Sequence, residues 1–180
     1  MNDSQHAYGP ISKALHWSMA GLFLLQFASS GAKRVWGKEN VITELLGPHH
    51  ANIGIMLLAL VIVRIAWAFR QRQNRPVHTG PQGKLVTRGH LALYALMLLV
   101  PVAAVLIRLG TGKPLTFFGF ALLPAGEGIA WAKEVGFTLH KPLAWVLAAS
   151  IAGHIGMALY HRFVKRDDSL ARITLSKATR

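Results

Sequence analysis

Two histidines near the end of the chain have the spacing that is most informative about chemistry. His140 and His154 lie fourteen residues apart in an apolar stretch. At about 100° and 1.5 Å per residue of α-helix, this separation is close to four turns, so both imidazoles lie on one face about 21 Å apart. Because imidazole is a common ligand of transition metals, a helix with this spacing can present one ligand to each of two metal centres.

Two further histidines match these positions on other apolar stretches. His50 begins the second stretch and is expected at the depth of His140, which begins the fourth. His16 lies early in the first stretch and is expected at the depth of His154, because successive membrane spans run in opposite directions. Each pair therefore joins two helices at one height, in an outer and an inner layer.

The spacing alone leaves the inner pair ambiguous. His90 begins the third apolar stretch and competes with His16, while His161 follows His154 by seven residues, which is again close to a whole number of turns. The basic residues that follow His161 favour an interfacial or substrate-facing role for it. The remaining histidines, which are expected to be exposed loop residues, are His6, His49 and His78.

The other potential ligands in the sequence narrow the choice of metal centre. The apolar stretches contain no Asp or Glu, and the chain contains no cysteine. Zinc prefers three or four converging ligands, and without cysteine there are no iron–sulfur clusters, thioether-linked haem or disulfides. The sequence therefore predicts two haem groups, each held between two imidazoles. Such haems carry single electrons, because no coordination position on the iron stays open.

The elements that must position these histidines are apolar helices. The chain has 180 residues, of which 52% are hydrophobic and 15% charged, whereas soluble domains carry about a quarter charged residues. Residues 14–30, 51–69, 90–107 and 143–163 are long enough to cross a hydrocarbon core of ~30 Å. We predict an all-α, four-helix transmembrane bundle that forms a single domain over residues 1–180. The apolar segment 115–125 is too short to cross and is expected on the membrane surface.

The charge distribution predicts the orientation and the partners. The net charge is +13, and the basic residues lie between the apolar stretches, where anionic lipid headgroups can neutralise them. No nucleic-acid-binding motif is present, so no nucleic acid partner is expected. Twelve Lys and Arg flank one side of the predicted spans and seven flank the other, which places both termini in the cytoplasm.

Two features of the spans have alternative interpretations. The first span could instead be a secretory signal, since Lys13 precedes it and small residues follow it. Arg64 is the one charge well inside a span, fourteen residues after His50 and on the same helix face. Its side chain either reaches the inner membrane surface or pairs with a propionate of the inner haem.

The motifs around these residues resemble a known family. They are Leu15-His16-Trp17, His50 with Gly54 and Arg64, Gly89-His90-Leu91 with Tyr94 and Pro101, then His140, His154 and His161, and the tail Lys165-Arg166-Asp167-Asp168-Ser169-Leu170. Together they cover nearly the whole chain. The sequence is similar to the bacterial cytochrome b561 family, small di-haem proteins of the inner membrane that include superoxide oxidase.

The resemblance implies an assignment of the ligands and an activity. It implies that His16 and His154 hold one haem b, and that His50 and His140 hold the other. It also implies that electrons pass between ubiquinone and a second partner, which in similar members is superoxide at the outer face. The loop before the fourth span departs in detail from the family pattern. Four outer basic residues could attract a small anion: Arg108, Lys113, Lys133 and Lys141.

Two other functional classes remain to be compared with this one. The chain could be a haem-bearing membrane anchor that relays electrons between a partner dehydrogenase or hydrogenase and the quinone pool. A non-redox transporter is disfavoured, because four helices without carboxylates give no ion pathway. On either redox hypothesis, His90 or His161 is a candidate for hydrogen bonding to a quinone oxygen at the inner layer.

Overall fold

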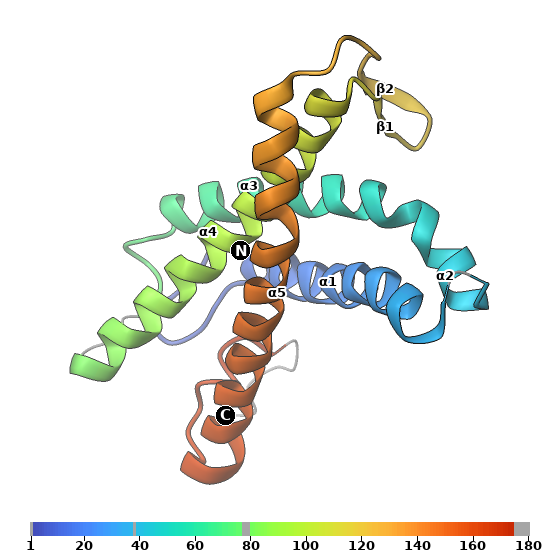
Figure 1. Cartoon of the computed structure of the whole chain (residues 1–180). Coiled ribbons are helices and arrows are strands. Elements are labelled where there is room, and N and C mark those ends of the chain that lie inside the picture. Colours follow the sequence, from blue (N-terminus) through green and yellow to red (C-terminus); the bar gives the residue numbers. More distant parts are fainter. Residues whose placement is uncertain (1, 38, 77–79, 175–180) are drawn as a thin grey trace.

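The computed structural model describes residues 2–37, 39–76 and 80–174, and these are mostly helical (Figure 1). Four long helices are α1 (Pro10–Trp36), α3 (His50–Arg70), α4 (Gly80–Thr111) and α5 (Ala130–Tyr160). Short elements are α2 (Val41–Leu46), the 3₁₀ turn Gly47–His49, the hairpin strands β1 (Leu115–Phe117) and β2 (Phe120–Leu123), and the π-helical turn His161–Lys165. His78 lies outside the described residues, as do three of the basic residues counted for the orientation: Lys38, Lys177 and Arg180.

The long helices form two antiparallel pairs. Helix α1 lies against α3, and α4 makes the most extensive contact with α5. In the view of Figure 1, the α1/α3 pair crosses the α4/α5 pair, and the two pairs meet mainly through α3 and α4. Residues far apart in sequence are therefore brought together where the pairs cross, which is also where the candidate ligands lie.

Three of the helical segments are long and apolar enough to cross a membrane. They are Val41–Arg70, Gly83–Thr111 and Ala130–Lys165, with mean hydropathies of 2.1, 2.4 and 1.6. Helix α1 has 27 residues, but His16, Gln26 and several serines lower its hydropathy. The four predicted spans therefore correspond to four long helices, of which three meet the criterion for a span within the described residues.

The helices extend beyond the predicted spans. Helix α4 begins at Gly80, ten residues before residue 90, and α5 begins at Ala130, thirteen before residue 143. Pro142 lies inside α5, although proline removes a helical hydrogen bond. His90 and His140 therefore lie within helices and not at their first residues.

Segment 115–125 is a β-hairpin, which the all-α prediction did not include. Phe117 pairs with Phe120, so Phe118 and Gly119 form a two-residue loop with φ values of 45° and 91°. A type I′ turn requires positive φ at both central positions. The backbone nitrogen of Phe118 donates to Asn52 Oδ1 at 3.0 Å, which ties the hairpin to α3. The predicted position of this segment on a membrane surface remains a prediction.

The buried core lies where three helices meet. It consists of Met19 and Phe23 from α1, Ile53, Leu57 and Val61 from α3, and Leu147 from α5, with part-buried residues of α4 around it. Many large apolar side chains elsewhere on the helices are exposed, among them Leu24, Ile62, Leu91, Trp145 and Phe163. An apolar exterior of this kind is suited to lipid, which supports the prediction from composition.

The N-terminal residues are tied to the segment that follows α3. The side chain of Asp3 is fully buried and accepts hydrogen bonds from Gly9 N at 2.8 Å, Ser12 Oγ at 2.9 Å and Arg75 Nε at 3.0 Å. Trp67 Nε1 donates to Ser12 Oγ at 3.0 Å. These bonds fix the start of α1 against the end of α3, and so fix the depth of His16 relative to α3.

Candidate haem-binding site

Helix α5 places its two same-face histidines opposite histidines from other helices. The ring centroids of His50 and His140 are 6.5 Å apart, and those of His16 and His154 are 6.3 Å apart. We call the end of the molecule with His50 and His140 the outer end, and the end with His16 and His154 the inner end. The structure thus brings together the two pairs that the sequence analysis proposed.

The separation of the rings suits a metal ion held between them. A metal ion lies about 2.0–2.1 Å from each imidazole nitrogen, and the ring centroid lies about 1.1 Å behind that nitrogen. Two imidazoles on opposite sides of one ion therefore have centroids about 6.3 Å apart. Within the described residues, no three His, Cys, Asp or Glu side chains converge as a zinc site requires. At the outer end the donor set among the described residues is a pair of imidazoles.

At the outer end, hydrogen bonds orient the two candidate ligand imidazoles. His140 Nδ1 lies 2.9 Å from the carbonyl oxygen of Val100, which can only accept, so this nitrogen donates and Nε2 keeps its lone pair. His50 Nδ1 lies 3.0 Å from Ser29 Oγ and 3.1 Å from Ser30 Oγ. A hydrogen bond at Nδ1 that orients the ring is typical of histidine ligands of metals.

A large cavity lies between the outer histidines. Its volume is about 830 Å³, and its lining includes His50, His140 and apolar side chains from all four long helices: Phe23, Phe27, Leu57, Met97, Val100 and Leu147. Four basic residues also line it: Lys33, Arg34, Arg108 and Lys141. Haem b is a flat apolar macrocycle with two propionates. Apolar walls, facing imidazoles and basic side chains therefore fit this group.

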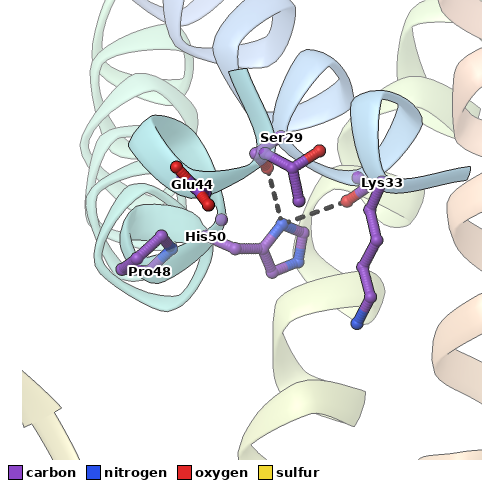
Figure 2. Close-up of a pocket in the computed structure, with 8 residues that line it drawn as sticks. Ser29, Lys33, Glu44, Pro48 and His50 are labelled. Atoms are coloured by element: carbon purple, nitrogen blue, oxygen red, sulfur yellow. Dashed lines mark hydrogen bonds between the residues drawn. The ribbon is translucent and has the colours of Figure 1, made fainter. Parts of the chain in front are cut away.

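A smaller pocket of about 420 Å³ adjoins this cavity on its outer side (Figure 2). Its lining comes from the end of α1, from α2 and from the 3₁₀ turn, and includes Ser29, Lys33, Glu44, Pro48 and His50. His50 lines both spaces, so its ring forms part of the wall between them. Figure 2 shows the imidazole pointing toward Ser29 and Lys33 on α1.

At the inner end, three histidines from three helices lie together. His154 has its ring centroid 6.3 Å from that of His16 and 5.4 Å from that of His90. His90 Nδ1 lies 3.0 Å from the carbonyl oxygen of Val86 on its own helix. Both His16 and His90, the alternatives that spacing left open, therefore lie close to His154. The His16 pair is the one whose separation matches a shared metal ion.

Arg64 points into the interior of the molecule at this inner end. Its Nη2 lies 3.3 Å from His16 Nδ1, and its Nε donates to the Tyr94 hydroxyl at 3.1 Å. The side chain is half-buried. These contacts place a permanent positive charge beside a candidate ligand, and the pairing of Arg64 with a haem propionate stays a prediction.

His161 occupies a separate position in the π-helical turn that follows α5. Its Nδ1 pairs with Asp167 Oδ2 at 2.5 Å, and no histidine ring of the described residues faces it in the way that His16 faces His154. Hydrogen bonds from Ser169 and from His161 hold the pKa of the Asp167 carboxyl well below its usual range. His6 and His49 are exposed, as predicted; the prediction for His78 falls outside the described residues.

Several residues at the site were not identified from the sequence. Gln26, Ser29 and Ser30 surround His50, and Asp167 pairs with His161. The available signal was the group of polar residues within the apolar first stretch, because polar groups at membrane depth usually have a function. The partner of His140 is a backbone carbonyl, for which the sequence carries no signal at all.

Comparison with known proteins identifies the family. A family model described as "Prokaryotic cytochrome b561" matches residues 7–175. Cytochrome b561 homolog 2 of Escherichia coli (strain K12) is 34% identical over 173 residues, covering 92% of this chain and 90% of the relative. Cytochrome b561 homolog 1 of the same strain is 26% identical over 161 residues, covering 88% and 92%. With three apolar helices that can span a membrane, this chain therefore belongs to the bacterial cytochrome b561 family, whose members are inner-membrane proteins that bind haem b and transfer electrons.

Proposed function

We propose that the protein binds two haem b groups and transfers electrons from superoxide at its outer end to ubiquinone at its inner end. The observation that carries this proposal is the pair of interhelical histidine contacts at two heights, with ring centroids 6.5 and 6.3 Å apart. Haem b between two imidazoles supplies one-electron redox chemistry, because its iron has no open position. A two-site protein of this kind can connect reactants on opposite sides of a membrane.

The proposed ligands are His50 and His140 at the outer end and His16 and His154 at the inner end. The 5.4 Å separation of His90 from His154 is shorter than two imidazoles on one iron require, which favours His16. His90 then lies beside the inner site without being a ligand. This assignment agrees with the ligand set that the family resemblance implies.

Excess positive charge supports an anionic reductant at the outer end. Four basic residues line the outer cavity, namely Lys33, Arg34, Arg108 and Lys141, and no carboxylate appears among the described residues that line it. Two propionates would neutralise two of these charges. The remaining two, beside apolar walls of low dielectric constant, attract a small anion such as superoxide.

The inner end offers groups that can deliver protons to a quinone. Reduction of ubiquinone to the quinol consumes two electrons and two protons. His161 is oriented by Asp167, and His90 lies close to His154, so either imidazole could hydrogen-bond a quinone oxygen. The positive residues that follow His161 lie at the predicted cytoplasmic surface, where protons are available.

The proposal places α1 across the membrane as a fourth span, with both termini cytoplasmic. A helix of 27 residues is ~40 Å long, enough to cross a hydrocarbon core. Helix α1 lies antiparallel to α3, which is itself apolar enough to span, and its polar residues Gln26 and Ser29 face His50. The excess of basic residues on the side of the termini supports this orientation.

Haem content and single-turnover kinetics test this function. Purified protein is expected to contain two haems per chain by pyridine haemochrome assay, and His50→Ala or His140→Ala should remove one and spare the other. The purified chain should consume superoxide rapidly only when a ubiquinone analogue is present. One haem per chain, or loss of both from either variant, would contradict the two-site assignment.

The hairpin favours a second candidate function, that of a membrane anchor relaying electrons to or from a partner dehydrogenase or hydrogenase subunit. Phe118, Phe120 and Leu122 are exposed beside the outer site, and such apolar side chains can dock a protein. If the isolated chain exchanges electrons with quinone but does not react with superoxide, the anchor function is preferred.

A further inference from the structure

A single segment of α1 contacts both nitrogens of the His50 imidazole. Ser29 Oγ lies 3.0 Å from His50 Nδ1, and Gln26 Nε2 lies 3.2 Å from His50 Nε2 (Figure 2 shows the bond to Ser29). Ser29 is buried, with 4% of its surface exposed. The exposed Ser30 places a second hydroxyl 3.1 Å from Nδ1. The orientation of His50 is therefore determined largely by α1.

The hydroxyl proton of Ser29 determines the tautomer of His50. Ser29 Oγ donates this proton to the backbone carbonyl of Gln26 at 2.7 Å, so toward His50 the oxygen can only accept. With Ser29 Oγ as the acceptor, Nδ1 carries the imidazole proton and Nε2 keeps a lone pair. The amide nitrogen of Gln26 lies 3.2 Å from Nε2 and donates to that lone pair in this structure, so the Gln26 side chain must turn away for Nε2 to bind iron.

We propose that Ser29 is a positioning residue for the outer haem, which sets both the tautomer of His50 and the electron density on its ligand nitrogen. The inference rests on the proposed function, specifically on His50 as a ligand. A hydrogen bond from Nδ1 to an acceptor increases the basicity of a ligating imidazole. A more basic ligand stabilises ferric over ferrous iron, so this bond lowers the reduction potential of the outer haem.

The chain contains a matched control for this hydroxyl. Ser150 Oγ donates to the carbonyl of Val146 on its own helix at 2.7 Å, the same length as the Ser29 bond to Gln26. Ser150 contacts no histidine in the described hydrogen bonds. Replacing either serine by alanine therefore removes one bond to the backbone, but only Ser29→Ala removes a partner of His50.

The test is a potentiometric titration of the complete protein, with the outer component identified by its absence in His50→Ala. Ser29→Ala should raise the ratio of reduced to oxidised outer haem at a fixed potential about three- to tenfold, the range for one net hydrogen bond. The inner component should not change, and the g values of the ferric outer haem should shift toward those of a weaker axial ligand. Ser29→Thr, which keeps the hydroxyl, should restore the wild-type ratio. The double variant Ser29→Ala/Ser30→Ala should show the largest change.

The possible outcomes separate this inference from the proposed function. If Ser29→Ala loses the outer haem and Ser29→Thr recovers it, the hydroxyl positions the ligand even more strongly than expected. An unchanged ratio, an equal change in Ser150→Ala, or a loss that Ser29→Thr does not reverse would overturn the inference. If His50→Ala itself spares both haems, the proposed function fails. If His50→Ala removes one haem and Ser29→Ala changes nothing, only the role of Ser29 fails.

Discussion

Arg64 contacts His16 inside the molecule, with Nη2 lying 3.3 Å from Nδ1 of the imidazole. The same guanidinium donates from Nε to Tyr94, so α3 connects the histidine of α1 to the tyrosine of α4. A fixed positive charge beside a redox group favours the reduced form, which carries one positive charge fewer. Arg64 is therefore expected to make the inner site easier to reduce.

Replacing the charge of Arg64 tests this electrostatic effect. Arg64→Gln should lower the ratio of reduced to oxidised inner haem at a fixed potential by about tenfold, given a Coulomb interaction across a partly buried site. Arg64→Lys should preserve most of the ratio, and Tyr94→Phe, which removes only the hydroxyl, should change it less than Arg64→Gln does. A potentiometric titration gives all three values. Equal effects of Arg64→Gln and Arg64→Lys would show that hydrogen-bond geometry, and not charge, is responsible.

The Asp167–His161 contact predicts a pH dependence in the segment after α5. The pKa of Asp167 is lowered by hydrogen bonds from Ser169 and His161, so the ionised carboxylate stabilises the folded turn. Because the pKa is lower in the folded protein, the ionised carboxylate contributes to the stability of the fold at pH values above the unfolded pKa of 3.8. This stability is lost as the pH falls through the pKa of the folded protein. We expect the carboxyl ¹³C resonance of Asp167 to stay in its ionised position at pH 4. Titration of Asp167 near its ordinary value would contradict the contact.

Close backbone packing of α4 on α5 predicts a site of steric intolerance. A Cβ atom on Gly136 would lie 2.7 Å from Ile107 N and 2.9 Å from Ala103 O, which are backbone atoms that cannot rotate away. Gly136→Ala should therefore destabilise the protein by about 1–3 kcal/mol. Gly21→Ala in α1, where no atom lies within 4 Å of the added methyl, is the matched control and should not destabilise it. Thermal unfolding in detergent measures both, and equal melting temperatures would refute the close packing.

The hairpin loop carries backbone strain that a substitution can relieve. Phe118 has φ of 45°, in a region that costs a residue with a Cβ atom about 1–2 kcal/mol, whereas asparagine tolerates it. Phe118→Asn should slow hydrogen exchange of the hairpin amides several-fold. Gly119→Ala, at φ 91°, should accelerate exchange. Faster exchange in Phe118→Asn would mean that contact between the Phe118 and His49 rings, 6.4 Å apart, outweighs the strain.

The buried carboxylate of Asp3 predicts a large stability effect at the inner end. Asp3→Ala would leave Arg75 without its ion pair and would remove the acceptor for Gly9 N and Ser12 Oγ, at a cost of about 3 kcal/mol. Arg72→Ala is the control, since Arg72 is exposed and lies over the ring of Phe69. Thermal unfolding and protease sensitivity of the N-terminus report the change. A shift no larger than that of the control would rule out a structural role for the ion pair.

Composition and spacing determined the broad fold and the two-layer pattern of histidines. Lipid as solvent requires long apolar helices, and a fourteen-residue separation places His140 and His154 on one helix face wherever the helix lies. The ends of the helices were harder to predict. Helix α5 continues through Pro142 and α4 begins ten residues before residue 90, because a helix can extend beyond the apolar segment that hydropathy marks.

Only the tertiary structure decided which groups meet the imidazoles. The carbonyl of Val100 reaches His140 from the neighbouring helix, and Ser29 reaches His50 across the α1/α3 contact. Segment 115–125 forms a hairpin because its two strands pair across a turn with positive φ at Phe118, a conformation that local preference disfavours. Sequence periodicity specifies the face of one helix, but the rotation and depth of its neighbours follow from side-chain packing between helices. Those two variables determine the contacts of His50 and His140 with the neighbouring helices.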